Sequence, residues 1–202
     1  TAPGICIRLW NEGQTAALAP FDTPEVLAAD LANLVLDLAN WGVSEPSALP
    51  FLDPPPAPAW AEAVALLQRL EALDAAGHIT PDGKALARLP LHPRLAHMVV
   101  AAAADDDART AAELAVLIGE RGLGGDGTDL SHRLDRFRRE AGKRAADAKT
   151  LAARWAKLAG GGSGGNLPAG HHLARAFPDR VAQAAGPRGK FRLANGRQAS
   201  LD

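Results

Sequence analysis

Apolar residues recur at helical spacing along most of the chain. Between residues 24 and 38, leucine and valine return every third or fourth position, after a Thr-Pro-Glu start at residues 23–25. Threonine caps a helix and proline fits its first turn, so this stretch predicts one helix, which Gly42 ends. A second apolar stripe predicts another helix over residues 60–73.

The same pattern predicts further helices downstream. Thr-Pro-Asp at residues 80–82 repeats the start signal, and Pro93 begins another apolar stripe. The three aspartates at 105–107 interrupt that stripe and suit a solvated N-terminus of the next helix. The predicted helices cover residues 80–89, residues 93 to about 104, and residues 107 to about 118. Residues 129–158 form one long helix or a broken pair, and residues 168–184 form the last helix.

Strand signals lie at the two ends and at one short stretch between them. Residues 4–10 alternate apolar side chains and predict a half-buried strand, in which Cys6 is a small buried hydrophobe. Residues 77–79 are predicted to be extended. Asn-Gly at 195–196 favours a two-residue turn, so residues 191–199 predict a hairpin that forms the edge of a further domain.

Two stretches predict connectors. Six prolines between residues 44 and 58 exclude a helix there, and the glycine run at 160–165 predicts a flexible linker. Two helices, a short extended segment and a turn over about 60 residues are typical of a winged-helix-like unit. The predicted fold class is therefore mainly α, with a winged-helix-like unit, a helical bundle after it, and short β segments at both ends.

Composition supports this class. Hydrophobic residues make up 47% of the chain, many of them alanine, and tyrosine is absent, which favours helix over strand. A single cysteine excludes an internal disulfide and fits a reducing compartment, so we expect a cytoplasmic protein. No apolar run approaches the ~20 residues that span a bilayer, so no membrane partner is expected. Because the chain starts inside a predicted strand, we expect it to be a piece of a longer protein.

The net charge of -1 hides a strong asymmetry along the chain. Residues 1–131 carry 7 lysines and arginines against 18 acids, whereas residues 132–202 carry 15 against 5. A basic half commonly meets a phosphate backbone. The alternative is that the two halves simply pack on each other.

The sequence contains no recognisable catalytic motif. Residues 77–85 (GHITPDGKA) resemble a phosphate-binding loop but have the wrong glycine spacing, no hydroxyl after the lysine, and a proline where a donor is needed. His92, His171 and His172 have no ligand partners at metal spacing, so cap or surface roles are expected. The aspartates at 105–107 lack the alternating ligands of a calcium loop. No catalytic residue, metal or cofactor is predicted in this chain.

Two basic patches are candidates for nucleic-acid contact. Residues 132–157 are rich in arginine and lysine, and Arg136, Arg139 and Lys143 would share one face of a continuous helix. The alternative is a solvated helix with internal ion pairs such as Arg136 to Glu140. The second patch surrounds the predicted hairpin. The candidate nucleic-acid-binding residues are Arg133, Arg136, Arg139, Lys143, Arg144, Arg188, Lys190 and Arg192.

Several motifs, in order and at their spacings, resemble one protein family. They are PGICIRLW at 3–10, TPE at 23–25, FLDPP at 51–55, ALD at 72–74, ITPDG at 79–83, ARLPLHPRLA at 87–96, FPDRVAQ at 177–183 and FRLANGRQASLD at 191–202. The set resembles the region after the second RecA-like domain of DEAH-box ATP-dependent helicases, and the later motifs resemble the bacterial HrpB-type branch.

The resemblance implies a domain order and a role. Residues 1–20 would end the second RecA-like domain, 21–90 would form the winged-helix-like domain, 91–160 the helical ratchet (HA2-type) domain, and 161–202 a linker, a helix and the start of a truncated C-terminal domain. The family's ATPase motifs would lie upstream, so ATP and magnesium would belong to the parent enzyme and this piece alone would be inactive. The implied partners are single-stranded RNA or DNA and a RecA-like helicase core in cis.

Two other functions fit the same elements. A standalone winged-helix regulator would need a recognition helix rich in arginine, lysine, asparagine or glutamine, but the helices predicted in 24–89 are acidic or apolar. A helical protein–protein scaffold would bind no nucleic acid in a salt-dependent way.

Overall fold

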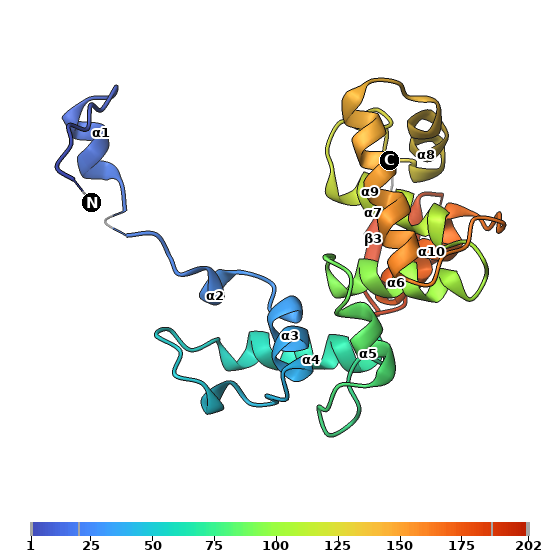
Figure 1. Ribbon diagram of the computed structural model, residues 1–202, viewed down its shortest axis with the longest axis horizontal. Coiled ribbons are helices and arrows are strands. Elements are labelled where there is room, and N and C mark those ends of the chain that lie inside the picture. Colours follow the sequence, from blue (N-terminus) through green and yellow to red (C-terminus); the bar gives the residue numbers. More distant parts are fainter. Residues whose placement is uncertain (1, 20, 187, 201–202) are drawn as a thin grey trace.

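The computed structural model describes residues 2–19, 21–186 and 188–200, and it confirms a mainly α-helical fold with a small sheet near the C-terminus (Figure 1). The elements in chain order are α1 (Glu12–Ala17), α2 (Glu25–Ala28), α3 (Ala32–Asn40), the 3-10 helix η1 (Pro46–Ala48), α4 (Ala57–Arg69), α5 (Pro81–Leu86), α6 (Pro93–Ala103), α7 (Ala108–Gly119), α8 (Leu130–Arg139), α9 (Lys143–Leu158), α10 (Ala169–Ala176), the 3-10 helix η2 (Pro178–Arg180), β1 (Ala182–Ala184), β2 (Lys190–Leu193) and β3 (Gln198–Ser200).

The strand predicted for residues 4–10 is wrong. These residues form no regular element, and the side chains of Ile5 and Leu9 are 95% and 93% exposed. Cys6 is likewise exposed rather than buried. A strand needs a hydrogen-bonded neighbour, and no strand in the described part of the chain pairs with this segment. The segment extends away from the body of the molecule (Figure 1), and its apolar side chains are exposed.

The helix predicted from residue 24 to 38 is two helices, α2 and α3. The chain leaves helical geometry at Ala29 (φ -80°, ψ 161°). Asp30 Oδ1 then accepts a hydrogen bond from the backbone N–H of Ala32 at 2.8 Å. An aspartate that bonds to the nearby backbone in this way competes with the helical ladder, which explains the break. Gly42 follows the end of α3 with a φ of 92°, as predicted.

Helices α3, α4 and α5 form the winged-helix-like unit, in which α3 packs against the other two. The extended segment predicted at 77–79 is confirmed by an antiparallel bridge between Leu73 and Ile79. Thr80 caps α5, because its Oγ1 accepts a hydrogen bond from the N–H of Gly83 at 2.9 Å. Residues 77–85 are therefore a turn into a short helix, as predicted.

Helices α6 to α9 form the helical bundle, in which α7 packs against the three others. Residues 129–158 are the broken pair that the sequence allowed, with the break at Gly142 (φ 104°). Lys149 of α9 closes the break: its Nζ donates to the carbonyl oxygens of Arg138 at 2.9 Å and Glu140 at 2.7 Å. These bonds satisfy carbonyls that the end of α8 leaves free.

The glycine run at 160–165 is not the flexible linker that its composition predicts. The carbonyl of Gly162 accepts from the N–H of Arg109 at 3.0 Å, and the N–H of Gly165 donates to the carbonyl of Asp106 at 2.9 Å. A Cβ added at Gly165 would lie 2.5 Å from the Cβ of Asp107. The glycines therefore let this segment lie directly against the loop of residues 105–107, and that close packing fixes its path.

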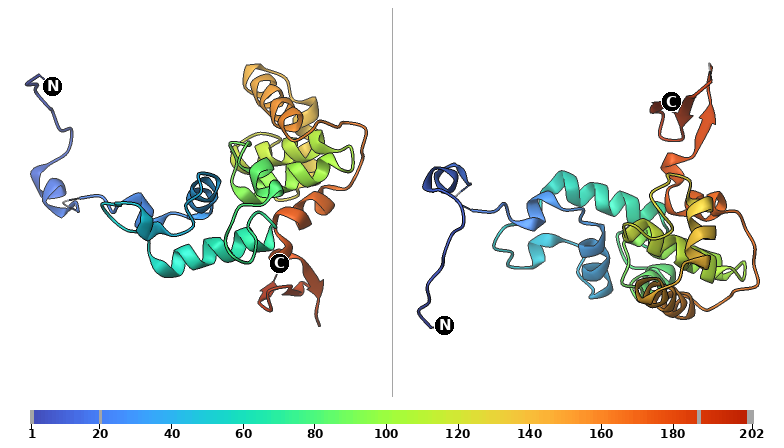
Figure 2. Two further views of the ribbon diagram at one scale, coloured as in Figure 1. Left: turned by 60° about the horizontal axis from the view of Figure 1, so that its bottom comes forward. Right: turned by 90° about the horizontal axis from the view of Figure 1, so that it is seen from above.

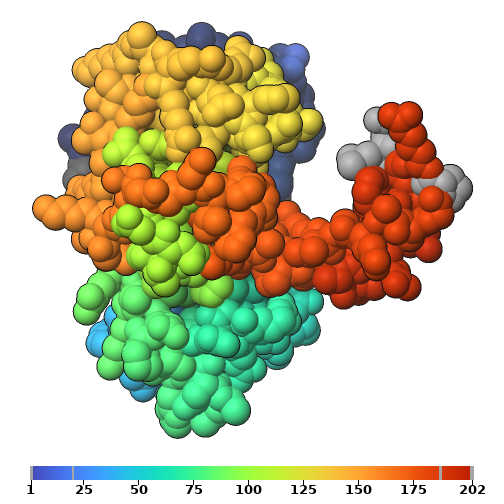
Figure 3. Space-filling model, turned by 90° about the vertical axis from the view of Figure 1, so that its right-hand side faces the viewer, coloured from blue at the N-terminus to red at the C-terminus, as the bar shows by residue number. Residues whose placement is uncertain are grey.

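The C-terminal helix is shorter than predicted. Helix α10 packs against α6 and ends at Ala176, since Pro178 cannot continue it, and residues 182–184 are strand β1 instead of helix. The predicted hairpin is confirmed, since β2 pairs antiparallel with β3 and the sheet order is β1-β2-β3. The predicted two-residue Asn-Gly turn is wrong: the N–H of Leu193 donates to the carbonyl of Arg197, so the turn has three residues, 194–196, and Gly196 supplies its positive φ of 84°. The sheet projects from the body of the molecule (Figure 3).

No helix among residues 2–19, 21–186 and 188–200 combines the length and apolar character needed to cross a membrane. The domain boundaries predicted near residues 20, 90 and 160 stay predictions. Residue 90 lies between α5 and α6, and residue 160 follows the end of α9.

Candidate nucleic-acid interface

Helix α8 carries the first basic patch, and its amphipathic sequence decides which cations are free. Asp129 caps its N-terminus by accepting hydrogen bonds from the N–H groups of Ser131 and His132. Leu134 and Phe137 are buried and turn one face of the helix toward the bundle. The remaining faces carry the arginines.

Arg133 and Arg138 serve the fold. One terminal nitrogen of Arg133 donates to the carbonyl oxygens of Leu117 at 3.0 Å and Leu123 at 3.1 Å. Arg138 bonds through Nε to the buried carboxylate of Glu113 at 2.8 Å. Because Arg133 has its guanidinium on internal carbonyls, it is the candidate in this patch with the least freedom to meet a phosphate.

Arg136 and Arg139 are exposed on α8, and we call these two the basic face. Lys143 is also exposed, but it lies beyond the break at Gly142, so the prediction that it shares one helical face with them is wrong. The ion pair considered between Arg136 and Glu140 is replaced by another contact, since Glu140 Oε2 accepts a hydrogen bond from the N–H of Gly124 at 2.9 Å.

Arg144 lies at the start of α9, where its guanidinium donates to the carbonyl of Arg121 and lies 3.6 Å from Glu120 Oε2. The second predicted patch is separate. Arg188, Lys190 and Arg192 are exposed on β2 and the turn before it. Both views in Figure 2 place the strands on the opposite side of the bundle from α8 and α9. The candidate residues therefore form two surfaces rather than one.

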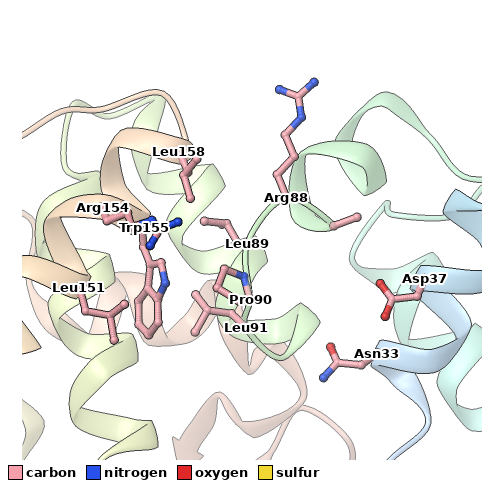
Figure 4. Close-up of a pocket in the computed structure, with 11 residues that line it drawn as sticks. Asn33, Asp37, Arg88, Leu89, Pro90, Leu91, Leu151, Arg154, Trp155 and Leu158 are labelled. Carbon is pink, nitrogen blue, oxygen red and sulfur yellow. The ribbon is translucent and has the colours of Figure 1, made fainter.

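A hollow that sequence reasoning missed lies between the winged-helix-like unit and α9 (Figure 4). Its volume is about 500 Å³. It is lined by Asn33, Asp37, residues 87–91, Leu151, Arg154, Trp155 and Leu158. The two polar residues of α3 face it from one side, Trp155 and Arg154 from the other, and Arg88 stands at its rim (Figure 4). No spacing signal joins residues so distant in sequence, so only the packing of the two units reveals the hollow.

A buried polar pair joins α10 to the start of α7. Asp107 and His172 are both 0% exposed, and their Oδ2 and Nε2 atoms are 2.9 Å apart. The expected solvated role for Asp107 and the expected cap or surface role for His172 are therefore wrong. His92 does act as a cap, since its Nδ1 accepts from the N–H of Arg94 at the start of α6.

The environment of Asp107 favours its carboxylate. Burial alone raises the pKa of this group, but a hydrogen bond from the side chain of Thr110, the N–H of Leu167 and the contact with His172 outweigh it, so the pKa is lowered from 3.8. The described residues contain no group of three or more histidine, cysteine, aspartate or glutamate side chains placed to hold a metal ion.

A family model described as helicase associated domain (HA2), winged-helix, matches residues 63–91. ATP-dependent RNA helicase HrpB of Escherichia coli (strain K12) is 36% identical over 201 residues, which cover 99% of this chain and 24% of that protein. A crystal structure of E. coli DExH-box NTPase HrpB matches with a TM-score of 0.74 and 33% identity, over 95% of this chain and 23% of that one. The resemblance to the C-terminal region of HrpB-type DEAH-box helicases is confirmed.

The HrpB likeness covers both candidate surfaces, whereas the likeness to DHX34 and to HrpA covers about half of the chain. Probable ATP-dependent RNA helicase DHX34 of Mus musculus is 37% identical over 100 residues, which cover 50% of this chain and 9% of its own. The HA2 winged-helix match includes the second half of α4, all of α5 and residues 87–91, which line the hollow. This chain spans about a quarter of the length of HrpB.

Proposed function

We propose that this chain is the accessory region, winged helix plus ratchet, of an ATP-dependent helicase, and that it guides single-stranded nucleic acid past a RecA-like motor. The similarity to HrpB over 99% of the chain carries this proposal. The exposed cations of the basic face and Lys143 support the strand-guiding part. RNA is the favoured substrate because the curated relatives are named as RNA helicases.

The role proposed for the cations is to attract and hold the phosphate backbone without reading sequence. Arginine and lysine side chains that are free in solvent can each replace a counterion on a phosphate, whatever the base. The fixed arginines Arg133 and Arg138 contribute by holding α8 against α7 and its following loop, which keeps the basic face in place.

A titration of the chain with fluorescent single-stranded RNA tests this proposal. A surface that meets about three phosphates of a single strand loses roughly 20-fold in affinity between ~50 and ~200 mM salt. The double variant Arg136→Glu with Arg139→Glu should weaken binding and flatten this salt dependence. The charge-matched control is Arg8→Glu with Arg69→Glu, two exposed arginines elsewhere on the chain. A scaffold function predicts no binding even at low salt, and that result would overturn the proposal.

The proposal also assigns ATP hydrolysis, with its magnesium, to a RecA-like core in the parent enzyme. The sequence has no phosphate loop or DEAH box, and residues 77–85 form a turn and a capped helix. We therefore expect no phosphate release from ATP by the purified chain, with or without RNA. Turnover that persists through successive purification steps would contradict this assignment.

A further inference from the structure

The hollow between the winged-helix-like unit and α9 has the chemistry of a nucleotide site. Its volume of about 500 Å³ falls in the range of sites that hold small organic ligands. It contains no residue of the basic face and none of the predicted nucleic-acid-binding residues. The proposed function therefore leaves it without a role.

Two arginines flank this hollow from different units. Arg88 follows α5 and Arg154 lies on α9, and both are exposed. Within the described ranges, neither has a carboxylate within ion-pair distance. Guanidinium groups bind phosphate through paired, directional hydrogen bonds, so two uncommitted ones beside a single hollow favour an anionic phosphodiester.

The floor of the hollow is apolar. Pro90, Leu91, Leu151 and Leu158 line it, beside the largely buried ring of Trp155, which is 8% exposed. Such a floor covers the faces of a flat aromatic ring, which every nucleobase presents. A free phosphate or a sugar would leave this apolar surface unused.

The wall opposite α9 can bond to the edge of a base. Asn33 and Asp37 lie one turn apart on α3, are exposed, and face the hollow (Figure 4). The Asn33 amide offers donors and an acceptor, whereas the Asp37 carboxylate only accepts. A carboxylate there favours bases that carry an exocyclic amino group, and it disfavours uracil, which has none.

We propose that this hollow holds one nucleotide of a single strand, with its phosphate between Arg88 and Arg154 and its base on the apolar floor toward Asn33 and Asp37. The inference rests on the proposed function, because it takes the strand as the source of the nucleotide. Since its walls come from two units, an occupied hollow also holds the winged-helix-like unit against α9.

The test compares two double variants of the full chain in binding to short fluorescent oligo(A). Arg88→Glu with Arg154→Glu should weaken binding about tenfold or more, as expected when two charge-assisted contacts are lost. The control is Lys84→Glu with Lys157→Glu, which changes exposed cations on α5 and α9 that lie outside the hollow. We expect the logarithm of the affinity for oligo(A) to fall less than a third as much in the control as in the Arg88→Glu with Arg154→Glu variant. Melting temperatures should match wild type in both, because all four side chains are exposed.

Base preference gives a second, independent readout. Asp37→Ala should reduce the ratio of oligo(A) to oligo(U) affinity, while Asn40→Ala, an exposed position on α3 outside the hollow, should leave it unchanged. Photo-crosslinking with an oligo(A) that carries one 8-azidoadenosine should label peptides that contain residues 87–91 or 151–158. Labels confined to α8 would overturn the inference.

The outcomes separate this inference from the proposed function. One outcome is that Arg136→Glu with Arg139→Glu abolishes binding, while Arg88→Glu with Arg154→Glu and Asp37→Ala bind as wild type. The nucleotide site in the hollow is then wrong, and the strand-guiding function stands. If wild type binds no strand, both fall. If free AMP binds as tightly as the oligonucleotide and protects the same residues, the hollow belongs to mononucleotides and the strand assignment is overturned.

Discussion

The two most densely charged stretches of the chain, the acidic loop at residues 105–107 and the basic helix α8, use their charges in different ways. Asp107 is fully buried and bonds to His172 and to the N–H of Leu167. On α8, the side chains of Arg136 and Arg139 are exposed, and Nε of Arg139 donates to the carbonyl oxygen of Asp135 at 3.2 Å. The comparison teaches that a charge run in sequence is divided by packing into side chains that build the fold and side chains that remain free for a partner.

The largest expected effect is the loss of the buried pair. Replacing Asp107 with alanine leaves His172 Nε2 and the Leu167 N–H without their acceptor in the interior. Breaking a buried pair by removing one partner costs about 3–5 kcal/mol in the free energy of unfolding. Urea unfolding followed by circular dichroism measures this. Asp126→Ala, at an exposed position in the loop before α8, should stay within about 0.5 kcal/mol of wild type.

An equal loss of stability for both aspartate variants would erase the contrast. It would mean that the carboxylate of Asp107 is no more important to the fold than one in solvent.

Much of the helical architecture was predictable from sequence, because apolar spacing and capping residues act locally. The starts of α5 and α6 and the pairing of β2 with β3 follow from such signals. The sequence left open whether residues 129–158 form one helix or two. The helix break at Asp30 was missed, since the leucine stripe continues through it and the competing backbone bond leaves no periodic trace.

The candidate site was harder to predict, because its features depend on contacts between distant residues. Charge alone selected Arg133 and Arg136 equally, yet only the structure shows that Arg133 donates to carbonyls of α7 and of the loop that follows it. The glycine run at 160–165 looked flexible because its partner, the acidic loop, lies far away in sequence. The strand predicted for residues 4–10 did not form, because no strand in the described part of the chain pairs with it.

The glycine segment that covers the acidic loop should show an intermediate effect. In Gly165→Ala, the added methyl would meet the Cβ of Asp107, so something must shift, and overpacking of this kind costs about 1–3 kcal/mol. Gly170→Ala is the matched control, since a Cβ there meets nothing within 4 Å. It lies inside α10 and should stabilise by up to about 1 kcal/mol. Thermal unfolding of the two variants should therefore move in opposite directions.

If Gly165→Ala leaves the thermal stability unchanged, the glycine run at 160–165 can shift at little cost. The view that it is fixed against the acidic loop would then be wrong.

Acid should weaken the buried pair through Asp107 itself. Burial raises the pKa of Asp107, but hydrogen bonds from Thr110 and Leu167 and the contact with His172 lower it by more. The pKa in the folded protein is therefore below 3.8. A depressed carboxyl pKa contributes stability above the unfolded value, and this contribution is lost as pH falls through the folded value. The unfolding free energy should thus drop below about pH 4.

Other carboxylates with lowered pKa values, among them Asp74, Asp129 and Asp179, titrate in the same range, so Asp107→Asn supplies the reference. The difference in unfolding free energy between wild type and this variant should be constant near about pH 5. It should shrink toward about pH 3, as the carboxylate of Asp107 takes up a proton. A difference that stays constant across the range would show that Asp107 contributes nothing through its charge.

The smallest effect on stability is expected on the basic face. Arg136→Ala should change the free energy of unfolding by less than about 0.5 kcal/mol, because exposed side chains outside buried networks contribute little. Arg138→Ala, two positions away on the same helix, removes bonds to Glu113 and Thr110 and should cost about 1.5–3 kcal/mol. RNA affinity should show the reverse order, with the larger loss for Arg136→Ala. If one substitution lowers stability and RNA affinity together, α8 is not divided into structural and free arginines, and its cations act as one set.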